Sequence, residues 1–342
     1  MKIAAFGEIM LRLKSPGYSR LLQEHSLEAT FGGAEANVAM CLAAWGLPSR
    51  YVTLLPDNDL GRAAIRSLMA CGVDVSCLPQ VPGRIGVYFV EAGAGDRPSR
   101  VIYDRADSCI ARVKPGDIDW DAALSGVDLL HLTGITPGIS QSGADETLRA
   151  ARIAREKGVK VCLDLNYRSR LFRFGKTPTE LLLPLAREAD FLIANEAQFA
   201  PCLGFTGLPV PPEEGEPDPE FYRDYCEAVL NLLPQLKLLA ITRRRSLSIN
   251  RGTWAACLFD GEDFTQSRCY HLEDMVDRVG SGDAFTAGLL YAWAKDRPLS
   301  EAVEFAMASG VLKHTIPGDF NAVSVDEVET FMHSHGQANV IR

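Results

Sequence analysis

Short apolar runs alternate with longer segments in the middle of the chain, and this alternation constrains the fold more than any other feature. Four runs have the length and composition of buried strands: residues 129–132, 160–163, 191–194 and 238–242. Residues 142–157, between the first two runs, have helical spacing and end at Gly158. Strands that alternate with helices predict a mostly parallel sheet with helices on both faces, which is an α/β fold.

Polar residues stand at or just after the carboxyl ends of these apolar runs. They are Asn166, Arg168, Asn195, Thr242 and Arg243. In open parallel sheets, ligands bind beyond the carboxyl ends of the strands. The sequence therefore predicts a ligand site along this edge of the sheet.

Two further pairs of strand-like segments do not fit a plain parallel sheet. Residues 9–13 and 26–31 have half-exposed strand spacing, and Gly86–Glu91 with Arg100–Asp104 reads as a hairpin. We expect a small second β-sheet, formed by about residues 9–32 and 84–105, that stands off the main domain. It would present Tyr88, Tyr103 and Arg105, although a solvated strand face is an alternative interpretation.

Glycine turns precede two helix-like segments. Gly280-Ser281-Gly282-Asp283 opens a small, apolar helix, and the run from Gly32-Gly33 to Asn37 opens another over residues 38–45. A helix that starts at a glycine turn directs unpaired N–H groups and the positive end of its dipole outward, where they bind phosphate. Asp283 would then lie beside the anion, where its carboxylate can accept a proton from an attacking alcohol. Ordinary strand-to-helix turns are the alternative that these residues alone leave open.

Composition narrows the class of protein. A net charge of −9 over 342 residues argues against a nucleic-acid partner, which requires a basic face. The nine cysteines lack disulfide or metal-ligand spacing, and no run of 18 apolar residues or signal peptide is present. We therefore expect a cytoplasmic protein with free thiols, no membrane partner, a single domain over residues 1–342, and an exposed loop at residues 207–220.

Both glycine motifs are similar to those of one known family. Gly32-Gly33 with Ala36-Asn37-Val38-Ala39, and the run Asp277 to Asp283, resemble the two motifs of ribokinase-like (phosphofructokinase B-type) sugar kinases, and the resemblance covers essentially the whole chain. Within that family the chain resembles 2-keto-3-deoxygluconate kinases at residues 102–106, 164–168 and 318–321. The resemblance implies the ribokinase-like fold, with the small β-sheet as a lid over the sugar.

The resemblance also implies a reaction and a site. The γ-phosphoryl group of ATP would pass, with Mg²⁺, to the terminal hydroxyl of 2-keto-3-deoxygluconate, with Asp283 as general base and the amides of Gly280, Ser281 and Gly282 stabilising the transferred group. Candidate sugar contacts, besides Asp283, are Gly33, Asn37, Tyr88, Tyr103, Arg105 and Arg168. Candidate nucleotide contacts are Asn166, Asn195, Thr242, Arg243, Gly280 and Gly282. Arg105 and Arg168 suit the substrate's carboxylate, because guanidinium groups hold carboxylates by two parallel hydrogen bonds. K⁺ is a further candidate ligand, with Asp277 as its side-chain contact.

Two departures from the family pattern concern the nucleotide side. Gln198 stands where a Glu of the family's N-x-x-E element is usual, which bears on Mg²⁺. Residues 242–251 replace a glycine-rich turn with an arginine-containing run, in which residues 243–245 either contact phosphates or form a basic surface loop.

Two alternatives remain on the sequence alone. The chain is a family kinase for fructose, another ketohexonate or a nucleoside, or it is a catalytically inactive sugar- or nucleotide-binding regulator. The partners expected for a kinase are a sugar acid and ATP, and the exposed edge of the small sheet favours a homodimer formed through it.

Overall fold

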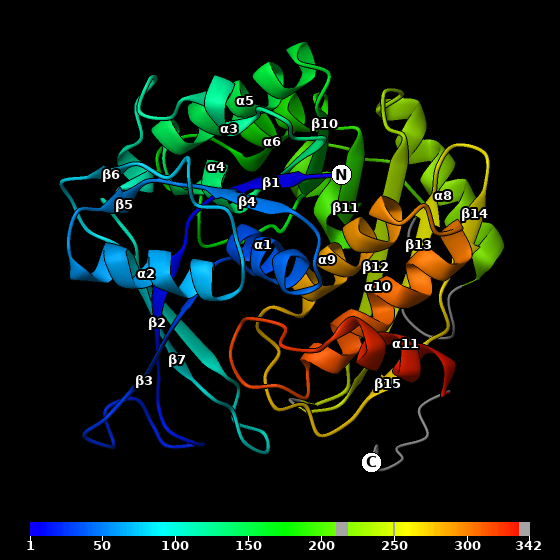
Figure 1. Ribbon diagram of the computed structural model, residues 1–342. Helices are drawn as coiled ribbons and strands as arrows, with labels where there is room; N and C mark the ends of the chain where they lie inside the picture. Colours follow the sequence, from blue (N-terminus) through cyan, green and yellow to red (C-terminus); the bar gives the residue numbers. More distant parts are fainter. Residues whose placement is uncertain (210–217, 249, 335–342) are drawn as a thin grey trace.

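The computed structural model describes residues 1–209, 218–248 and 250–334, and its centre is a nine-stranded sheet (Figure 1). The strand order is β14-β13-β12-β11-β10-β9-β1-β4, with β15 paired to β13. From β12 to β4 every pairing is parallel, whereas β13 is antiparallel to β12, β14 and β15. The strands are β1 (Ile3–Phe6), β4 (Ser49–Val52), β9 (Leu129–Thr133), β10 (Lys160–Asp164), β11 (Phe191–Ala194), β12 (Leu238–Ser246), β13 (Gly252–Phe259), β14 (Phe264–Gln266) and β15 (Tyr270–Leu272).

Helices cover both faces of this sheet, as the alternation predicts. One face carries α3 (Trp120–Ala123), α4 (Ile135–Ile139), α5 (Gln141–Glu156), α6 (Pro178–Ala186), α7 (Phe199–Leu203) and α8 (Pro219–Leu232). The other carries α1 (Ala34–Ala44), α2 (Asp59–Ala70), α9 (Ser281–Ala294), α10 (Leu299–Lys313) and α11 (Val325–His333). Two short strands, β5 (Leu55–Pro56) and β6 (Gln80–Val81), pair beside α2.

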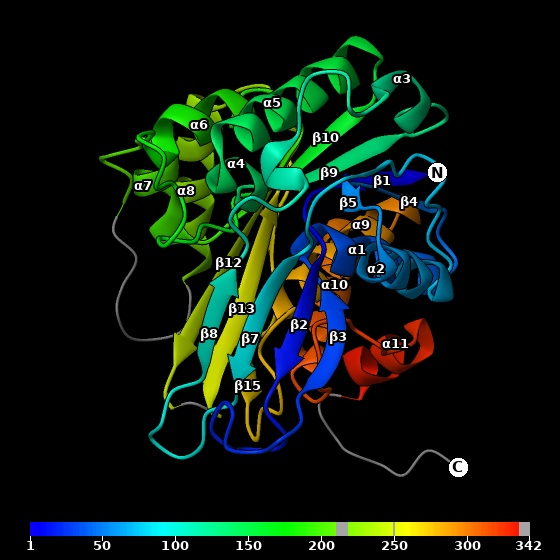
Figure 2. The same cartoon turned by 90° about the vertical axis from the view of Figure 1, so that its left-hand side faces the viewer.

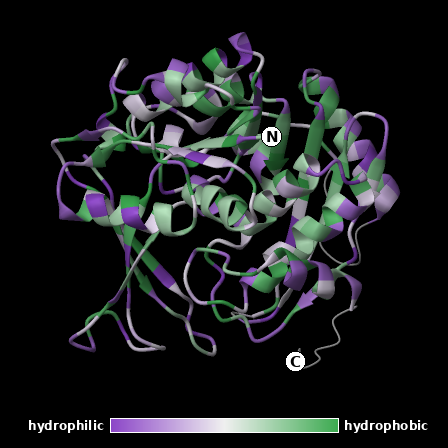
Figure 3. Cartoon of the chain, viewed as in Figure 1, coloured by the Kyte–Doolittle hydropathy of each residue, from purple (hydrophilic) through white to green (hydrophobic). Residues whose placement is uncertain are grey.

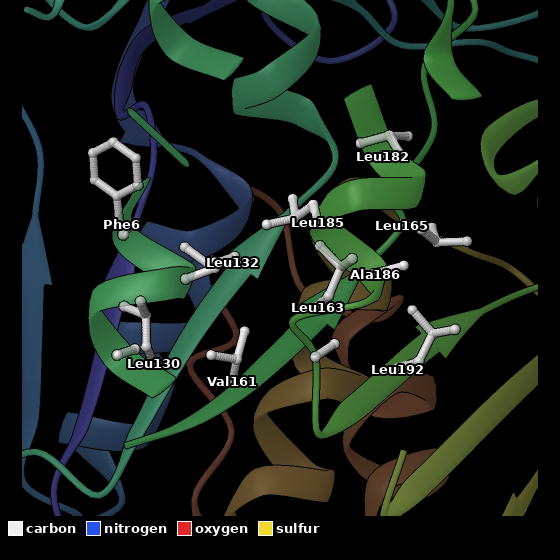
Figure 4. Packing of buried hydrophobic residues seen from close by; sticks show 14 of the residues in the cluster. Phe6, Leu130, Leu132, Val161, Leu163, Leu165, Leu182, Leu185, Ala186 and Leu192 are labelled. Atoms are coloured by element: carbon white, nitrogen blue, oxygen red, sulfur yellow. The ribbon is translucent and has the colours of Figure 1, made fainter. Parts of the chain in front are cut away.

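Side chains of successive strand residues enter different cores. Leu130 and Leu132 pack with Leu185 of α6 in one cluster (Figure 4), whereas Leu129 and Cys162 belong to the cluster on the opposite face. This follows from the two-residue period of a strand, which sends neighbouring side chains to opposite faces. Figure 3 shows the central strands and the helix surfaces packed against them as largely hydrophobic, with hydrophilic residues on the outer sides of the helices.

A separate four-stranded sheet stands off the main body (Figure 2). Its order is β3 (Glu28–Gly32), β2 (Met10–Lys14), β7 (Gly86–Glu91) and β8 (Arg100–Asp104), with β2 and β7 parallel and the outer pairs antiparallel. The small second sheet predicted from the sequence is therefore confirmed, and its strands lie within the expected segments.

For the arginine-containing run, the structure excludes one of the two alternatives left open by the sequence. Residues 242–246 are not a surface loop, because β12 continues to Ser246 and pairs with β13 through that residue. Most of the loop expected at 207–220 (residues 210–217) lies outside the described residues, and α8 already begins at Pro219.

Two other expectations concern the cysteines and membrane-spanning segments. The structure records all nine cysteines as thiols and none in a disulfide. Over the described ranges, no helix has both the length and the apolar character needed to cross a membrane.

Candidate active site

A cavity of about 690 Å³ lies at the carboxyl ends of the central strands, between the main sheet and the four-stranded sheet. Thirteen of the fifteen site residues predicted from the sequence line it: Gly33, Asn37, Tyr88, Tyr103, Arg105, Asn166, Arg168, Asn195, Thr242, Gly280, Ser281, Gly282 and Asp283. The other two, Arg243 and Asp277, do not line it. Segments almost 250 residues apart in the chain thus form one site.

The first turn of α9 forms one wall of the cavity. Gly280 caps the helix with φ 84°, and a Cβ there would lie 1.9 Å from the backbone oxygen of Asp319, so only glycine fits. A Cβ at Gly282, in contrast, would meet no atom within 4 Å. The positive end of the α9 dipole therefore opens into space that an anion can enter.

Asp283 is buried in this first turn. Its Oδ2 accepts a hydrogen bond from Nδ2 of Asn37, at 2.7 Å. Burial raises the pKa of Asp283 to about 6, while the Asn37 hydrogen bond and the charge of Arg168 hold it down. A carboxylate with a pKa close to neutral is suited to accept a proton at physiological pH.

The glycine pair at the start of α1 permits the contact between α1 and α9. A Cβ at Gly33 would lie 2.1 Å from the backbone oxygen of Glu8, so α1 can approach the loop after β1 only with glycine there. This approach places Asn37, one turn into α1, against Asp283.

Two further carboxyl groups lie beside Asp283, and the sequence did not single out either. Glu35 is fully buried and accepts hydrogen bonds from Oγ1 of Thr133 at 2.6 Å and of Thr136 at 3.3 Å. Burial raises the pKa of Glu35 to about 7. Burial, and then the charge of Asp283, raise the pKa of Asp164 to about 7 as well.

The two arginines expected at a substrate carboxylate differ in their surroundings. Arg105 is buried, and its guanidinium pairs with Glu8, with an Nε to Oε2 distance of 2.7 Å. Arg168 is exposed and forms no ion pair within 4 Å among the residues that the structure describes. Tyr103 stacks on Tyr88 with ring centroids 5.8 Å apart, beside Arg105. Arg168 is therefore the arginine whose charge remains available to an anion in the cavity.

Arg244, rather than Arg243, faces the cavity. Its guanidinium stacks on the ring of Trp254 at 4.5 Å and donates to Oγ of Ser281 at 3.1 Å and to the ring of His314. Arg243 instead lies over the ring of Tyr222, on the α8 face of the sheet. The placement expected for Arg243 is corrected by one residue, because neighbouring residues of β12 point to opposite faces.

Glu196 and Gln198 follow β11 in a short turn at the cavity wall. Gln198 accepts the backbone N–H of Asn195 at 3.0 Å, and Glu196 accepts the hydroxyl of Tyr222 at 2.5 Å. Nowhere in residues 1–209, 218–248 and 250–334 do three or more His, Cys, Asp or Glu gather to hold a metal ion. Mg²⁺ commonly takes one or two carboxylates together with substrate phosphates. Asp164 and Glu196 therefore fit an ion that arrives with a nucleotide.

Asp277 lies beneath the turn, and its carboxylate is engaged by the protein. Oδ2 accepts from Nη2 of Arg12 at 2.5 Å and from the N–H of Gly318 at 3.1 Å, and Oδ1 accepts from the N–H of Val279 at 3.0 Å. These contacts do not fit the role of a K⁺ ligand that was expected for Asp277.

The sheet with its two helical layers, the second sheet across the cavity and the glycine turn of α9 define the ribokinase-like class of fold. The family described as pfkB family carbohydrate kinase matches residues 1–324, and the chain belongs to it.

Relatives and solved structures agree with this membership. The chain is 40% identical to a 2-dehydro-3-deoxygluconokinase from Thermotoga maritima, whose crystal structure superposes with a TM-score of 0.89 over 97% of this chain and 99% of that one. A PfkB family carbohydrate kinase from Listeria grayi is 29% identical, with a TM-score of 0.88 over 97% and 99% of the two chains. A 2-dehydro-3-deoxygalactonokinase from Haloferax volcanii is 29% identical over 100% of this chain and 99% of its own.

Proposed function

We propose that the protein transfers the γ-phosphoryl group of ATP to the terminal hydroxyl of 2-keto-3-deoxygluconate or its galacto epimer. The observation that carries this proposal is the arrangement of Asp283 at the first turn of α9, in a cavity that also holds the guanidinium of Arg168, which makes no ion pair with any residue that the structure describes. A kinase for a sugar acid needs both a proton acceptor beside a phosphate site and a cation for the substrate's carboxylate.

Asp283 accepts the proton of the attacking hydroxyl. Burial and the Asn37 hydrogen bond fix its carboxylate, with a pKa of about 6, so most molecules carry the ionised form at neutral pH. The first N–H groups of α9 face the open space at Gly282 and stabilise the charge that develops on the transferred phosphoryl group.

Two arginines beside the same turn supply positive charge for the nucleotide phosphates. Arg244 is held by Ser281, and Arg278 donates to Oγ of Ser246 at 2.9 Å, and both line the cavity. Mg²⁺ bound to the phosphates would neutralise further charge, and Asp164 and Glu196, which line the cavity, would hold it.

Arg168 binds the carboxylate of the sugar acid in this proposal. A charge-assisted hydrogen bond contributes roughly 1.5 to 3 kcal/mol, and among the described residues Arg168 has no ion-pair partner that would have to be displaced. Arg105 serves mainly to fix Glu8 and to support Tyr103 at the sugar end of the cavity. The names of the relatives from Thermotoga maritima and Haloferax volcanii support a keto-deoxy sugar acid and differ in its epimer.

The four-stranded sheet closes over the sugar and excludes water from the transfer. Residues of β7 and β8, Tyr88 and Tyr103, already line the cavity, which supports this role. Its outer strands β3 and β8 are largely exposed, and such edges favour pairing with a second copy in a homodimer. Light scattering on the purified protein distinguishes a monomer from that dimer.

The experiment measures ATP consumption with 2-keto-3-deoxygluconate, its galacto epimer, fructose and adenosine, for the wild type and three variants. We expect kcat/KM to be highest for one of the two sugar acids. Arg168→Gln should lower it by about 10- to 100-fold, as the loss of about 1.5 to 3 kcal/mol predicts, and should change the value for fructose by less than about threefold. Arg170→Gln, an exposed arginine two residues further on, is the matched control and should behave as the wild type.

The variant Asp283→Asn tests whether the protein is an enzyme or only binds its ligands. It should retain ligand binding and lose at least about 100-fold in turnover, because the proton acceptor is gone. A preference for fructose or adenosine, or equal losses for acidic and neutral sugars in Arg168→Gln, would refute the substrate assignment. Undiminished turnover in Asp283→Asn would refute the base.

A further inference from the structure

Lys313 is a fully buried lysine at the last residue of α10. Its Nζ donates to the backbone oxygen of Ile316 at 3.0 Å. No carboxylate lies within 4 Å of Nζ in the part of the chain that the structure describes. Lysines are almost never fully buried, because desolvating an ammonium group is costly. The cost of burying this ammonium group therefore suggests that Lys313 has a specific structural or functional role.

The surroundings of Lys313 connect it to the turn of α9. The N–H groups of Val276 and Asp277 donate to the backbone oxygen of His314, at 2.7 and 3.2 Å, and Gly318 N–H donates to Asp277. The two segments 276–280 and 313–319 are thus joined, and Gly280 packs on the backbone of Asp319. The ammonium of Lys313 lies among these segments.

The charges around Lys313 balance without an added ion. Arg12 pairs with both Asp277 and Asp319, and the fields of those two carboxylates oppose the decrease that burial causes in the pKa of Lys313. Arg12 and Lys313 thus balance Asp277 and Asp319 in a buried space, and Asp283, the third carboxylate that acts on Lys313, lies in the cavity under the influence of Arg168. A K⁺ ion there would add an uncompensated charge, which a buried site opposes strongly.

The carboxylate of Asp277, which was expected to bind such an ion, and the carbonyl beside Lys313 already accept hydrogen bonds from the protein. The carboxylate of Asp277 accepts three hydrogen bonds, from Arg12, Val279 and Gly318, and the carbonyl of Ile316 accepts the ammonium of Lys313. K⁺ binding would have to displace these donors.

We propose that Lys313 is a built-in cation that takes the place of a monovalent metal ion beneath the α9 turn. It is a positioning residue: its ammonium binds the carbonyl of Ile316 within segment 313–319 and attracts the carboxylate of Asp277 in segment 276–280, and so fixes the Gly280 turn and the N–H groups that follow. The protein therefore attains its native stability, and the shape of its phosphate site, without K⁺. This inference does not depend on which sugar the protein binds.

The test compares thermal unfolding in tetramethylammonium chloride and in KCl, at an equal ionic strength of about 0.15 M. Tetramethylammonium is too large for a cation site of protein carbonyls. We use the wild type, Lys313→Ala, which leaves room for an ion, and Lys313→Met, which removes the charge but fills the space. Lys157→Ala, an exposed lysine at the end of α5, is the matched control.

We expect the Tm of the wild type and of Lys157→Ala to differ by less than about 1 °C between the two salts. Lys313→Ala should unfold several degrees lower in tetramethylammonium and recover part of that loss as K⁺ is titrated in, since an ion that binds only the native state stabilises it. Lys313→Met should lose stability without recovery. Rescue by K⁺ in the alanine variant alone distinguishes a cation role from simple packing.

Crystals of the wild type soaked in rubidium chloride give an answer even if both variants fail to fold. We expect no anomalous peak beside Asp277 and Ile316. A peak there, a K⁺-dependent rise in the wild-type Tm of more than about 3 °C, or a folded Lys313→Ala that ignores K⁺ would overturn the proposal.

Discussion

The hydrogen bond from Asn37 to Asp283 makes a quantitative prediction about the pH dependence of the reaction. We choose Asn37→Leu, which keeps the size of the side chain and removes the donor. That hydrogen bond, at 2.7 Å, opposes the increase that burial causes in the pKa of Asp283, which stands at about 6. A hydrogen bond to a charged group contributes about 1.5 to 3 kcal/mol, or roughly one to two pKa units. The apparent pKa should therefore rise to about 7 to 8.

The assay is kcat/KM for phosphoryl transfer between pH 5 and 9. A base must be ionised to act, so activity falls as the pH drops through its pKa. For the wild type, about a tenth of the molecules carry ionised Asp283 at pH 5 and about nine tenths at pH 7. Asn37→Leu should approach its plateau about one to two units higher. Ionisation of the substrates is common to both enzymes and cancels in the comparison.

Asn195→Leu is the control, because Asn195 lines the same cavity and makes no hydrogen bond to Asp283 in the described residues. It should change KM and leave the apparent pKa in place. Identical profiles for the wild type and Asn37→Leu, or a shift to lower pH in the variant, would refute the assignment of Asp283 as a base controlled by Asn37.

Two other predictions concern stability. Gly280→Ala should destabilise the protein strongly, because its Cβ would lie 1.9 Å from the backbone oxygen of Asp319. Gly282→Ala, whose Cβ would meet no atom within 4 Å, should keep the wild-type Tm and lose turnover, because its methyl group enters the phosphate site. Equal losses of Tm in the two variants would contradict this reasoning. Glu35→Gln tests the buried acid: the pKa of Glu35 is raised from 4.5 to about 7, so wild-type stability should decline as the pH rises between those values. Between pH 5 and 8, chemical denaturation should show a decline in the free energy of unfolding that is about 2.5 kcal/mol larger for the wild type than for Glu35→Gln, because the raised pKa values of Asp164 and Asp283 lower the stability of both proteins. Equal declines in the two proteins would exclude the assigned pKa of Glu35.

The sequence predicted the site through local features. Polar residues after apolar runs and glycines before helices depend only on neighbours in the chain, and they identified Asp283, Arg168 and Asn195. Asn37 was predicted from the resemblance to the sugar-kinase motif, and all four residues line the cavity. The fold class and the second sheet followed from spacing in the same way.

The features that could not be predicted from the sequence depend on where a strand ends and on contacts between residues far apart in the chain. Arg243 was predicted as a site residue because the strand was expected to end at Thr242. Since β12 continues to Ser246, Arg243 lies on the α8 face together with Leu239 and Ile241, and Arg244 lies on the other face. The pairing of Arg105 with Glu8 joins positions 97 residues apart, and no local sequence pattern predicts it.

The attachment of the four-stranded sheet limits how the cavity can open. Arg12 on β2 and Tyr88 on β7 reach across to Asp319, and Arg12 also holds Asp277, so the middle of the two central strands is fastened to the segments beneath the α9 turn. Breaking a buried ion pair costs roughly 3 to 5 kcal/mol, which would leave only about one molecule in 10² to 10⁴ with the whole sheet swung away. Substrate exchange is therefore expected to proceed by bending of the outer strand ends about a fixed base, and the geometry around Asp283 is retained while the cavity admits its ligands.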